Sequence, residues 1–307
     1  MKTQNRTLLY SLLGLLGLIL FSLKAILVKI GYKEGAGSVD LLFLRMFFSL
    51  PFYLVIILVH LFKEGLLPLR LYGKMIFLGL IGYYLSSFFD FEGLRYVSAS
   101  LERLILFVYP TFVLIFSAVL LKSKIYGYQK KAILFTYLGV LCLFLPVLLS
   151  EEKQDFAWIG VIYVFLASVF YALYLVGSQS LLQEISSNTY TAYVMFFSTL
   201  GVGIHFAFQT KPETLLKYPT SVYQIGAIMA FFCTVLPSFL ISYCIQKIGA
   251  SNFGVLASFG PLSTVILAYF ILGETLGVYQ ILGGIIIVTS IVYLNLRQLK
   301  ETQSKSN

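Results

Sequence analysis

Ten apolar runs of about 20 residues each follow one another along this 307-residue sequence. A helix of about 20 apolar residues spans the hydrocarbon core of a bilayer. We expect these runs to form spanning helices over residues 8–30, 40–62, 72–91, 98–121, 130–149, 157–181, 188–208, 222–245, 250–272 and 279–296. The sequence therefore predicts an all-α polytopic membrane protein with ten transmembrane helices.

The composition agrees with this interpretation. Charged residues make up 11% of the chain and the mean hydropathy is +0.90, whereas soluble domains carry about 25% charged residues. A net charge of +9 would suit a nucleic-acid partner, but the basic residues stand in short clusters between apolar runs, such as Lys122, Lys124, Lys130 and Lys131. We therefore expect a lipid bilayer, and no nucleic acid, around this chain.

The distribution of Lys and Arg also predicts the orientation. With a cytoplasmic N-terminus, thirteen basic residues lie in the inside segments and adjoining helix ends, five lie in the outside loops, and four lie within helices. Cytoplasmic loops of membrane proteins carry an excess of Lys and Arg. We therefore expect both termini to be cytoplasmic.

The sequence repeats itself after 151 positions. The matched residues include Ala99-Ser100 and Ala250-Ser251, Pro110 and Pro261, and Tyr128-Gln129 and Tyr279-Gln280. Five spans per half make the repeat inverted, which is typical of secondary transporters. We expect five-helix repeats at 1–150 and 151–298, a short cytoplasmic tail at 299–307, and hinges at the two prolines; a role in packing alone is the alternative for the prolines.

Three stretches resemble EamA-type members of the drug/metabolite transporter superfamily: "LFLRMFFSLPF" (42–52), "YVSASLERLILFVYP" (96–110) and "IGASNFGVLASFGPLSTVILAYFILGE" (248–274). The resemblance implies a ten-helix inner-membrane carrier that works by alternating access, with its cavity mainly between spans 1–4 and 6–9. Ser123 stands where the family has a Glu at the end of span four, whereas the second copy keeps Glu274. Lys24 stands in the first span, where small multidrug relatives have a buried Glu, and this argues against export of lipophilic cations.

Six charged residues lie in the outer half of the first repeat's spans: Lys24, Arg45, Asp90, Glu92, Glu102 and Arg103. Charges that face lipid are costly, so we expect these three cations and three anions to face one another or water. Because adjacent helix residues do not face each other, Arg103 is expected to pair with Asp90 or Glu92, and Glu102 with Arg45 or Lys24. Two interpretations stay open: a structural set of ion pairs that fixes spans 1–4, and an outer gate that opens for cargo or protons.

The remaining candidates for contact with cargo are uncharged: Tyr109, Tyr171, Tyr174 and Asn252. Tyr109 is seven residues beyond Glu102 and would share its face on a continuous helix. Tyr171 and Tyr174 are expected in the inner half of span six, where core packing is the alternative role, and Asn252 could instead hold helices together. Two His and three Cys without ligand spacing predict no metal site, and no cofactor is expected.

These features predict a secondary transporter, an exporter of a small polar metabolite such as an amino acid, with protons as the candidate coupling ion through Asp90 or Glu102. The alternatives are an organic-anion or sugar-phosphate carrier that uses the three cations, a membrane-embedded enzyme, and a receptor or scaffold. HExxH and GxSxG motifs are absent from the sequence, so no catalytic residue is predicted. The inverted repeat disfavours a fixed scaffold.

Overall fold

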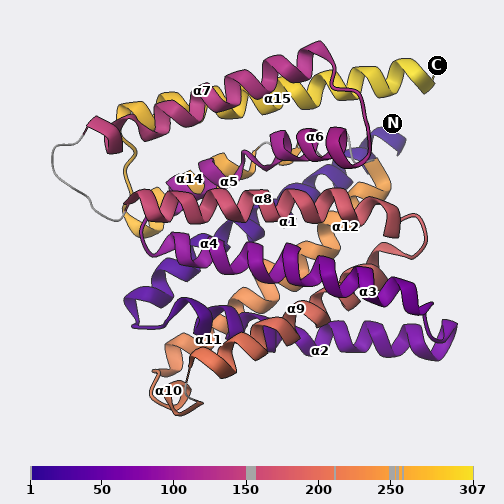
Figure 1. Ribbon diagram of the computed structural model, residues 1–307, viewed down its shortest axis with the longest axis vertical. Coiled ribbons are helices and arrows are strands. Elements are labelled where there is room, and N and C mark those ends of the chain that lie inside the picture. Colours follow the sequence, from indigo (N-terminus) through magenta and orange to yellow (C-terminus); the bar gives the residue numbers. More distant parts are fainter. Residues whose placement is uncertain are drawn as a thin grey trace.

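Helices account for nearly all of the computed structural model, which describes residues 2–149, 157–210, 212–248, 253, 256–257 and 259–306, and these residues contain no β-strand (Figure 1). In chain order the elements of the first half are α1 (Lys2–Lys33), α2 (Ser38–Glu64), α3 (Leu69–Leu78), the π-helix η1 (Gly79–Leu85), α4 (Ser86–Leu94), α5 (Ala99–Leu106), α6 (Tyr109–Leu120) and α7 (Gly127–Leu149). Those of the second half are α8 (Ala157–Leu181), α9 (Ser187–Gln209), α10 (Pro212–Leu216), α11 (Thr220–Ala230), the π-helix η2 (Phe231–Val235), α12 (Leu236–Ile248), α14 (Gly260–Leu272) and α15 (Val278–Ser306).

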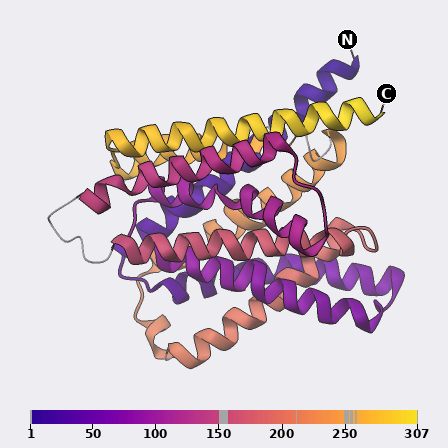
Figure 2. The same ribbon diagram turned by 45° about the horizontal axis from the view of Figure 1, so that its top comes forward.

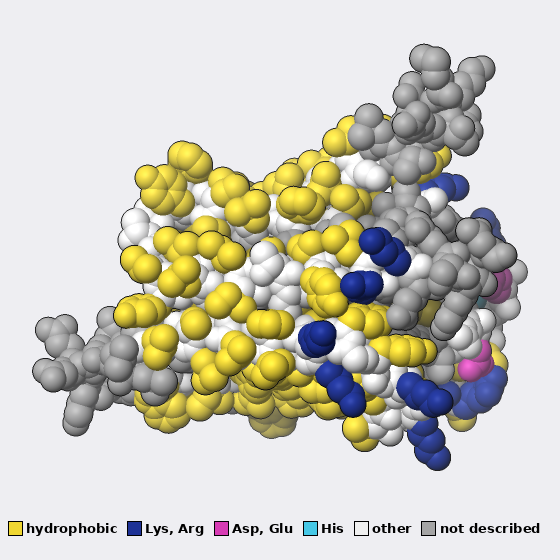
Figure 3. All heavy atoms as spheres, turned by 90° about the horizontal axis from the view of Figure 1, so that it is seen from above, with side chains coloured by type: hydrophobic (Ala, Val, Ile, Leu, Met, Phe, Trp, Pro, Cys, Tyr) yellow, Lys and Arg dark blue, Asp and Glu magenta, His cyan; other side chains and the backbone are white. Residues whose placement is uncertain are grey.

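Within the described residues, seven helical segments are long and apolar enough to cross a membrane. They are Leu9–Lys33, Ser38–Glu64, Ala99–Leu120, Trp158–Leu181, Ser187–Gln209, Thr220–Ile241 and Val278–Arg297, with Gly260–Leu272 as a shorter apolar helix. Figure 3 shows hydrophobic side chains over much of one face of the molecule. Large apolar side chains exposed over such an area are typical of a surface that faces lipid. The chain is therefore a multi-pass membrane protein with an all-helical fold.

Both chain termini lie at one end of the bundle (Figures 1 and 2), which we call the termini end. The α1–α2 turn, the α4–α5 link and the α14–α15 link lie at the opposite end (Figure 2). In Figure 3, Lys and Arg side chains gather toward the side of the termini. On the face that Figure 3 shows, the visible basic side chains therefore lie mainly toward the termini end.

Each half contains one π-helical segment at the matching place. Helix α3 continues through η1 into α4, and α11 continues through η2 into α12. A shift of 151 positions carries residues 79–85 onto 230–236, which includes all of η2. A π-helical turn accommodates an extra residue and changes the face that follows it, and such turns are frequent at functional sites.

Span four is interrupted at its proline. Helix α5 ends at Leu106, and α6 begins at Tyr109 with Pro110 in its first turn. Pro261 likewise lies in the first turn of α14. Proline has no backbone N–H to donate, and the first turn of a helix, where that N–H would have no partner within the helix, accommodates it without loss of a hydrogen bond. The two prolines thus begin new helical segments, and their role as hinges stays a prediction.

The ends of α6 and α14 share one backbone motif. The N–H of Ser123 donates to the carbonyl of Ser117 at 3.3 Å, and that of Glu274 donates to the carbonyl of Ala268 at 3.2 Å. Both are Schellman turns, which need a residue in the left-handed region just before the donor. Gly273 takes that conformation in α14 (φ 68°), whereas in α6 a lysine, Lys122, is held there (φ 54°).

Helices α7 and α15 pack side by side (Figures 1 and 2). A Cβ at Gly283 would lie 2.6 Å from the carbonyl oxygen of Gly139, so the two backbones meet there. The Ser290 hydroxyl donates to the carbonyl of Ala132 at 2.7 Å. A shift of 151 positions carries residue 139 onto 290 and residue 132 onto 283. The contact between 139 and 283 therefore corresponds to the contact between 290 and 132. The pair therefore has an approximate two-fold relation between the halves.

Candidate functional site

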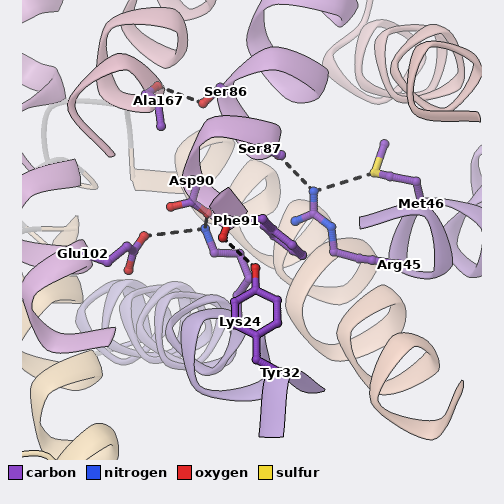
Figure 4. Close-up of polar contacts among 10 residues, drawn as sticks. All are labelled: Lys24, Tyr32, Arg45, Met46, Ser86, Ser87, Asp90, Phe91, Glu102 and Ala167. Carbon is purple, nitrogen blue, oxygen red and sulfur yellow. Dashed lines mark hydrogen bonds and ion pairs between the residues drawn. The ribbon is translucent and has the colours of Figure 1, made fainter. Parts of the chain in front are cut away.

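A lysine lies between two carboxylates where α1, α4 and α5 meet (Figure 4). Lys24 Nζ is 2.5 Å from Asp90 Oδ2 and 3.9 Å from Glu102 Oε1. The three residues are almost fully buried, with 5%, 2% and 0% of their surfaces exposed. The Lys24–Asp90 pair joins the first and third predicted spans, and the expected approach of Glu102 to Lys24 is confirmed.

Glu102 is held in place by the way α5 begins. Ser98 caps the helix by accepting a hydrogen bond from the N–H of Leu101 at 3.2 Å. The carboxylate of Glu274 accepts from the N–H groups of Ala99 and Ser100, at 2.8 and 3.0 Å, and from the Ser100 hydroxyl at 2.9 Å. The second repeat therefore fixes the first turn of α5, which carries Glu102.

Arg45 is buried beside this group and has no ion pair with any residue that the structure describes. Its guanidinium donates to the Ser87 hydroxyl at 3.0 Å and contacts the sulfur of Met46 (Figure 4). It also lies over the ring of Phe91, 5.1 Å from the centroid. A cation over an aromatic face is stabilised by the ring quadrupole. Arg45 therefore contributes positive charge close to Asp90.

The expected pairing of Arg103 with Asp90 or Glu92 is wrong. Arg103 lies over the ring of Phe21, 5.1 Å from the centroid, and Lys24 approaches the same ring at 5.4 Å. No carboxylate of the described chain lies within 4.0 Å of its guanidinium. Phe21 on α1 thus holds the arginine away from the two acids, and Gly260 of α14 leaves room for its end.

Glu92 is not part of the central group. Its carboxylate accepts a hydrogen bond from Ser38 and pairs with Arg95 at 3.0 Å, at the opposite end of the bundle. The expected balance of three cations and three anions therefore becomes three cations and two carboxylates: Lys24, Arg45, Arg103, Asp90 and Glu102. A regular helical period could not predict which face of α4 carries Asp90, because the π-helix η1 comes before α4 and shifts the faces that follow it.

A series of tyrosine rings in mutual contact begins at Tyr109 of α6 and extends to two tyrosines of α8. Tyr109 meets Tyr171 edge-on at 5.0 Å between ring centroids, and Tyr171 stacks on Tyr174 at 6.1 Å. Tyr83 from η1 and Tyr190 from α9 pack on Tyr174 at 5.1 and 6.2 Å. The shared face expected for Tyr109 and Glu102 does not follow from helical spacing, because the helix is interrupted between them. Asn252 lies outside the described residues.

A polar cavity of about 480 Å³ lies at the opposite end of the bundle, lined in part by Tyr32, Asp40, Arg95, Thr210 and Tyr218. Sequence reasoning missed Asp40, which accepts hydrogen bonds from Thr210 at 2.9 Å and Tyr218 at 2.5 Å. Burial and the neighbouring Asp40 carboxylate raise the pKa of Tyr218 to about 12. Asp40 therefore ties the start of α2 to the segment between α9 and α11.

Some of the missed contacts have a signal in the sequence. An acid in the first helical turn, like Asp40, is favoured by the helix dipole, and the Gly273-Glu274 pair is typical of a helix end. Neither pattern identifies the partner across the repeat. Among the described residues, no group of three or more His, Cys, Asp or Glu side chains could hold a metal ion.

Comparison with known proteins agrees with this architecture. "Uncharacterized transporter YcbK" of Bacillus subtilis (strain 168) is 30% identical over 297 residues, 94% of each chain. "Uncharacterized transporter YyaM" of the same organism is 27% identical over 241 residues, 78% of this chain and 79% of the relative. A solved structure titled "Crystal structure of protein" is 16% identical and has the same fold, with a TM-score of 0.59 over 94% of this chain and 98% of the other.

The repeat has a counterpart in a family of transporters. The sequence profile described as "EamA-like transporter family" matches residues 8–145 and again residues 158–296. The two matches together cover most of the chain, one in each half. The chain therefore belongs to the EamA-like transporter family.

Proposed function

We propose that this protein is a secondary transporter that exports a small zwitterionic metabolite, such as an amino acid, by alternating access. Membership of a transporter family and relatives named as transporters support the general role. One observation carries the choice of cargo. Two neighbouring residues of α5, Glu102 and Arg103, have opposite charges and buried polar atoms that make no hydrogen bond within the described chain.

The unpartnered atoms are both carboxylate oxygens of Glu102 and Nε of Arg103, which make no hydrogen bond within the described chain. Buried polar groups are nearly always hydrogen-bonded, and an unpartnered one is costly. An ammonium group fits a carboxylate, and a carboxylate fits a guanidinium. A zwitterion with both groups on one carbon would serve both residues when the site opens.

The same proposal includes ten spanning helices in two inverted five-helix repeats. Besides the seven long apolar helices, continuous helix over 69–94 and 127–149 and the segment that ends in α14 supply three more spans. The two π-helical segments, the Schellman turns and the α7–α15 pair support the repeat. The excess of Lys and Arg supports cytoplasmic termini in the cell (inner) membrane.

A second candidate is a carrier of organic anions or sugar phosphates. Because Glu92 lies apart from the site, the three cations Lys24, Arg45 and Arg103 face only two carboxylates. The resulting excess of one positive charge favours an anionic cargo. Guanidinium and ammonium groups are common ligands of phosphates and carboxylates. On this proposal the anion would occupy the side of the site near Arg103.

Transport by the purified protein in liposomes tests the choice between these cargoes. Vesicles are loaded with a mixture of standard amino acids, or with dicarboxylates and hexose phosphates, and exchange of a labelled member is measured. We expect exchange of amino acids only; exchange of the anions alone would favour the second candidate. Extracellular metabolites of a deletion strain and an overproducer then test the direction, since an exporter raises its cargo outside the overproducer.

Arg103→Ala should abolish this exchange while the protein still inserts and remains folded, because the cargo carboxylate would lose its guanidinium partner. Labelled-substrate exchange and a size-exclusion profile measure the two properties. Arg297→Ala, which removes an exposed cation at the end of the apolar segment of α15, is the matched control and should exchange normally. Wild-type exchange by Arg103→Ala would contradict the proposed cargo site.

A further inference from the structure

Lys24, Asp90 and Glu102 form a group of one cation and two acids (Figure 4), and all three residues are almost fully buried. Lys24 contacts both acids, and the carboxylate of Asp90 lies close enough to Glu102 to act on its charge. We propose that Asp90 and Glu102 form a proton-binding pair, with Glu102 as the group that gains and loses the proton. The proton site follows from these contacts, and its coupling to cargo rests on the function proposed above.

The first argument is charge. Two carboxylates that share one site do not both stay ionised at low cost, because like charges repel strongly away from water. Lys24 neutralises one of the two acids and leaves the three-residue group with one negative charge, since neither Arg45 nor Arg103 forms an ion pair with these carboxylates in the described chain. A single proton makes the three-residue group neutral. It also turns a carboxylate oxygen of Glu102 into a donor for the unpartnered Oδ1 of Asp90.

The second argument is the position of the ammonium group. An ammonium between two ionised carboxylates would be attracted about equally to both. Lys24 Nζ is instead 2.5 Å from Asp90 and 3.9 Å from Glu102. This asymmetry is the arrangement expected when Asp90 carries the negative charge and Glu102 carries the proton.

The surroundings offer Glu102 no better partner. Helix α5 packs on α1, α4, α8, α14 and α15, and leads into α6. The charged and titratable groups that face it from these elements and their neighbours are Lys24, Lys29, Asp90, Arg45 beyond Asp90, Arg103 of its own helix, Glu274, Tyr109 and Tyr171. Of the cations, Lys24 alone lies within 4.0 Å in the described chain, and Arg103 is turned onto Phe21.

Loss of the proton from Glu102 would then change which helices are joined by an ion pair. An ionised Glu102 attracts Lys24 away from Asp90, which weakens the link between α1 and α4 and forms one between α1 and α5. In the proposed transporter, the cargo ammonium takes the place of the proton at Glu102. One proton bound from outside is then released to the cytoplasm for each cargo molecule that leaves. Charge is conserved at the site, because one positive charge replaces another.

Infrared difference spectra of the protein in lipid vesicles test the proton site without any cargo. We expect the carbonyl band of a protonated carboxylic acid at neutral pH in the wild-type protein. The band should be lost in Glu102→Gln and kept in Glu92→Gln, which removes a buried acid two residues beyond Asp90. If Glu102→Gln fails to fold, Glu102→Asp is used instead. This variant keeps a carboxyl group and should give a band at a shifted frequency. A band unchanged in Glu102→Gln, or no band in the wild type, would overturn the proposal.

Proton movement tests the coupling. Vesicles containing a pH-sensitive dye are given the amino-acid mixture, and a one-for-one exchange should build an accumulation of about tenfold per pH unit. Glu102→Gln should lose this accumulation. An infrared band without amino-acid exchange would reject the cargo and leave the proton site standing. Amino-acid exchange without the band or proton movement would reject the proton site and leave the cargo.

Discussion

A buried charge such as Lys24 is stable only while its counter-charge is present, because the protein interior solvates ions poorly. Its two partners come from different helices, so the side chain acts as a link between α1, α4 and α5. Removal of one partner leaves a charge that cannot reach water. Replacement of both members of the Lys24–Asp90 pair by apolar residues leaves no charge from that pair and an apolar space that other side chains can fill.

Lys24→Met should therefore lower the free energy of unfolding by about 3–5 kcal/mol. The double variant Lys24→Met, Asp90→Leu should recover most of that loss, because neither member of the pair is left as an unpaired charge. Thermal unfolding of the four proteins of this double-mutant cycle in one detergent measures the effect. Losses that simply add would show that the two residues do not act as a pair.

The side chains that depart from expectation do so for identifiable reasons. A regular helical period cannot give the faces of Asp90 and Glu92, since η1 lies between them and the start of the span. Arg103 packs over the ring of Phe21, and this contact depends on how α1 packs against α5. Depth in the predicted spans limited the partner of Glu102 to Arg45 or Lys24, and the structure brings Lys24 to it.

At the scale of elements, local sequence predicts where helices begin and end, but it does not predict which residues elsewhere in the chain contact those ends. Pro110, Pro261 and the Gly273-Glu274 pair predict where helices begin and end. That the Glu274 carboxylate caps α5 of the other repeat could not be predicted, because the contact joins residues about 175 positions apart. Ser123, at the matching end of α6, has no carboxylate with which to make such a contact.

The two Schellman turns offer a paired test. A left-handed backbone conformation costs a residue with a Cβ about 1–2 kcal/mol, and glycine avoids that cost. Lys122→Gly should therefore stabilise the protein by about 1 kcal/mol, whereas Gly273→Ala should destabilise it by a similar amount. Unfolding temperatures in detergent report both. A lower unfolding temperature for Lys122→Gly would mean that its side chain has a role beyond the turn.

At the scale of the whole molecule, the α7–α15 pair relates one half to the other. Its two close contacts exchange under the 151-residue shift, and both involve small residues that allow backbones to meet. The charged site, in contrast, belongs to the first half except for the cap from Glu274 and the contact at Gly260. The halves therefore share a backbone plan and differ in chemistry.

Reporter fusions test the orientation proposed for the whole chain. Green fluorescent protein after residue 307 should fluoresce and alkaline phosphatase at the same place should be inactive, because the C-terminus is expected in the cytoplasm. Phosphatase after residue 156, between the halves, should be active and serves as the control for export. The reverse pattern at both positions would contradict the orientation.

The separation between Lys24 and Asp90 has a consequence for synthesis. Lys24 enters the bilayer with the first span, and its partner follows 66 residues later in the third. At about 5–20 residues per second, the lysine waits roughly 3–13 s for its counter-charge. A lone lysine in lipid is unfavourable, so the first span should stay within the insertion machinery until the third arrives. The ion pair that closes the mature site would thereby set the order in which the newborn helices are released into the membrane.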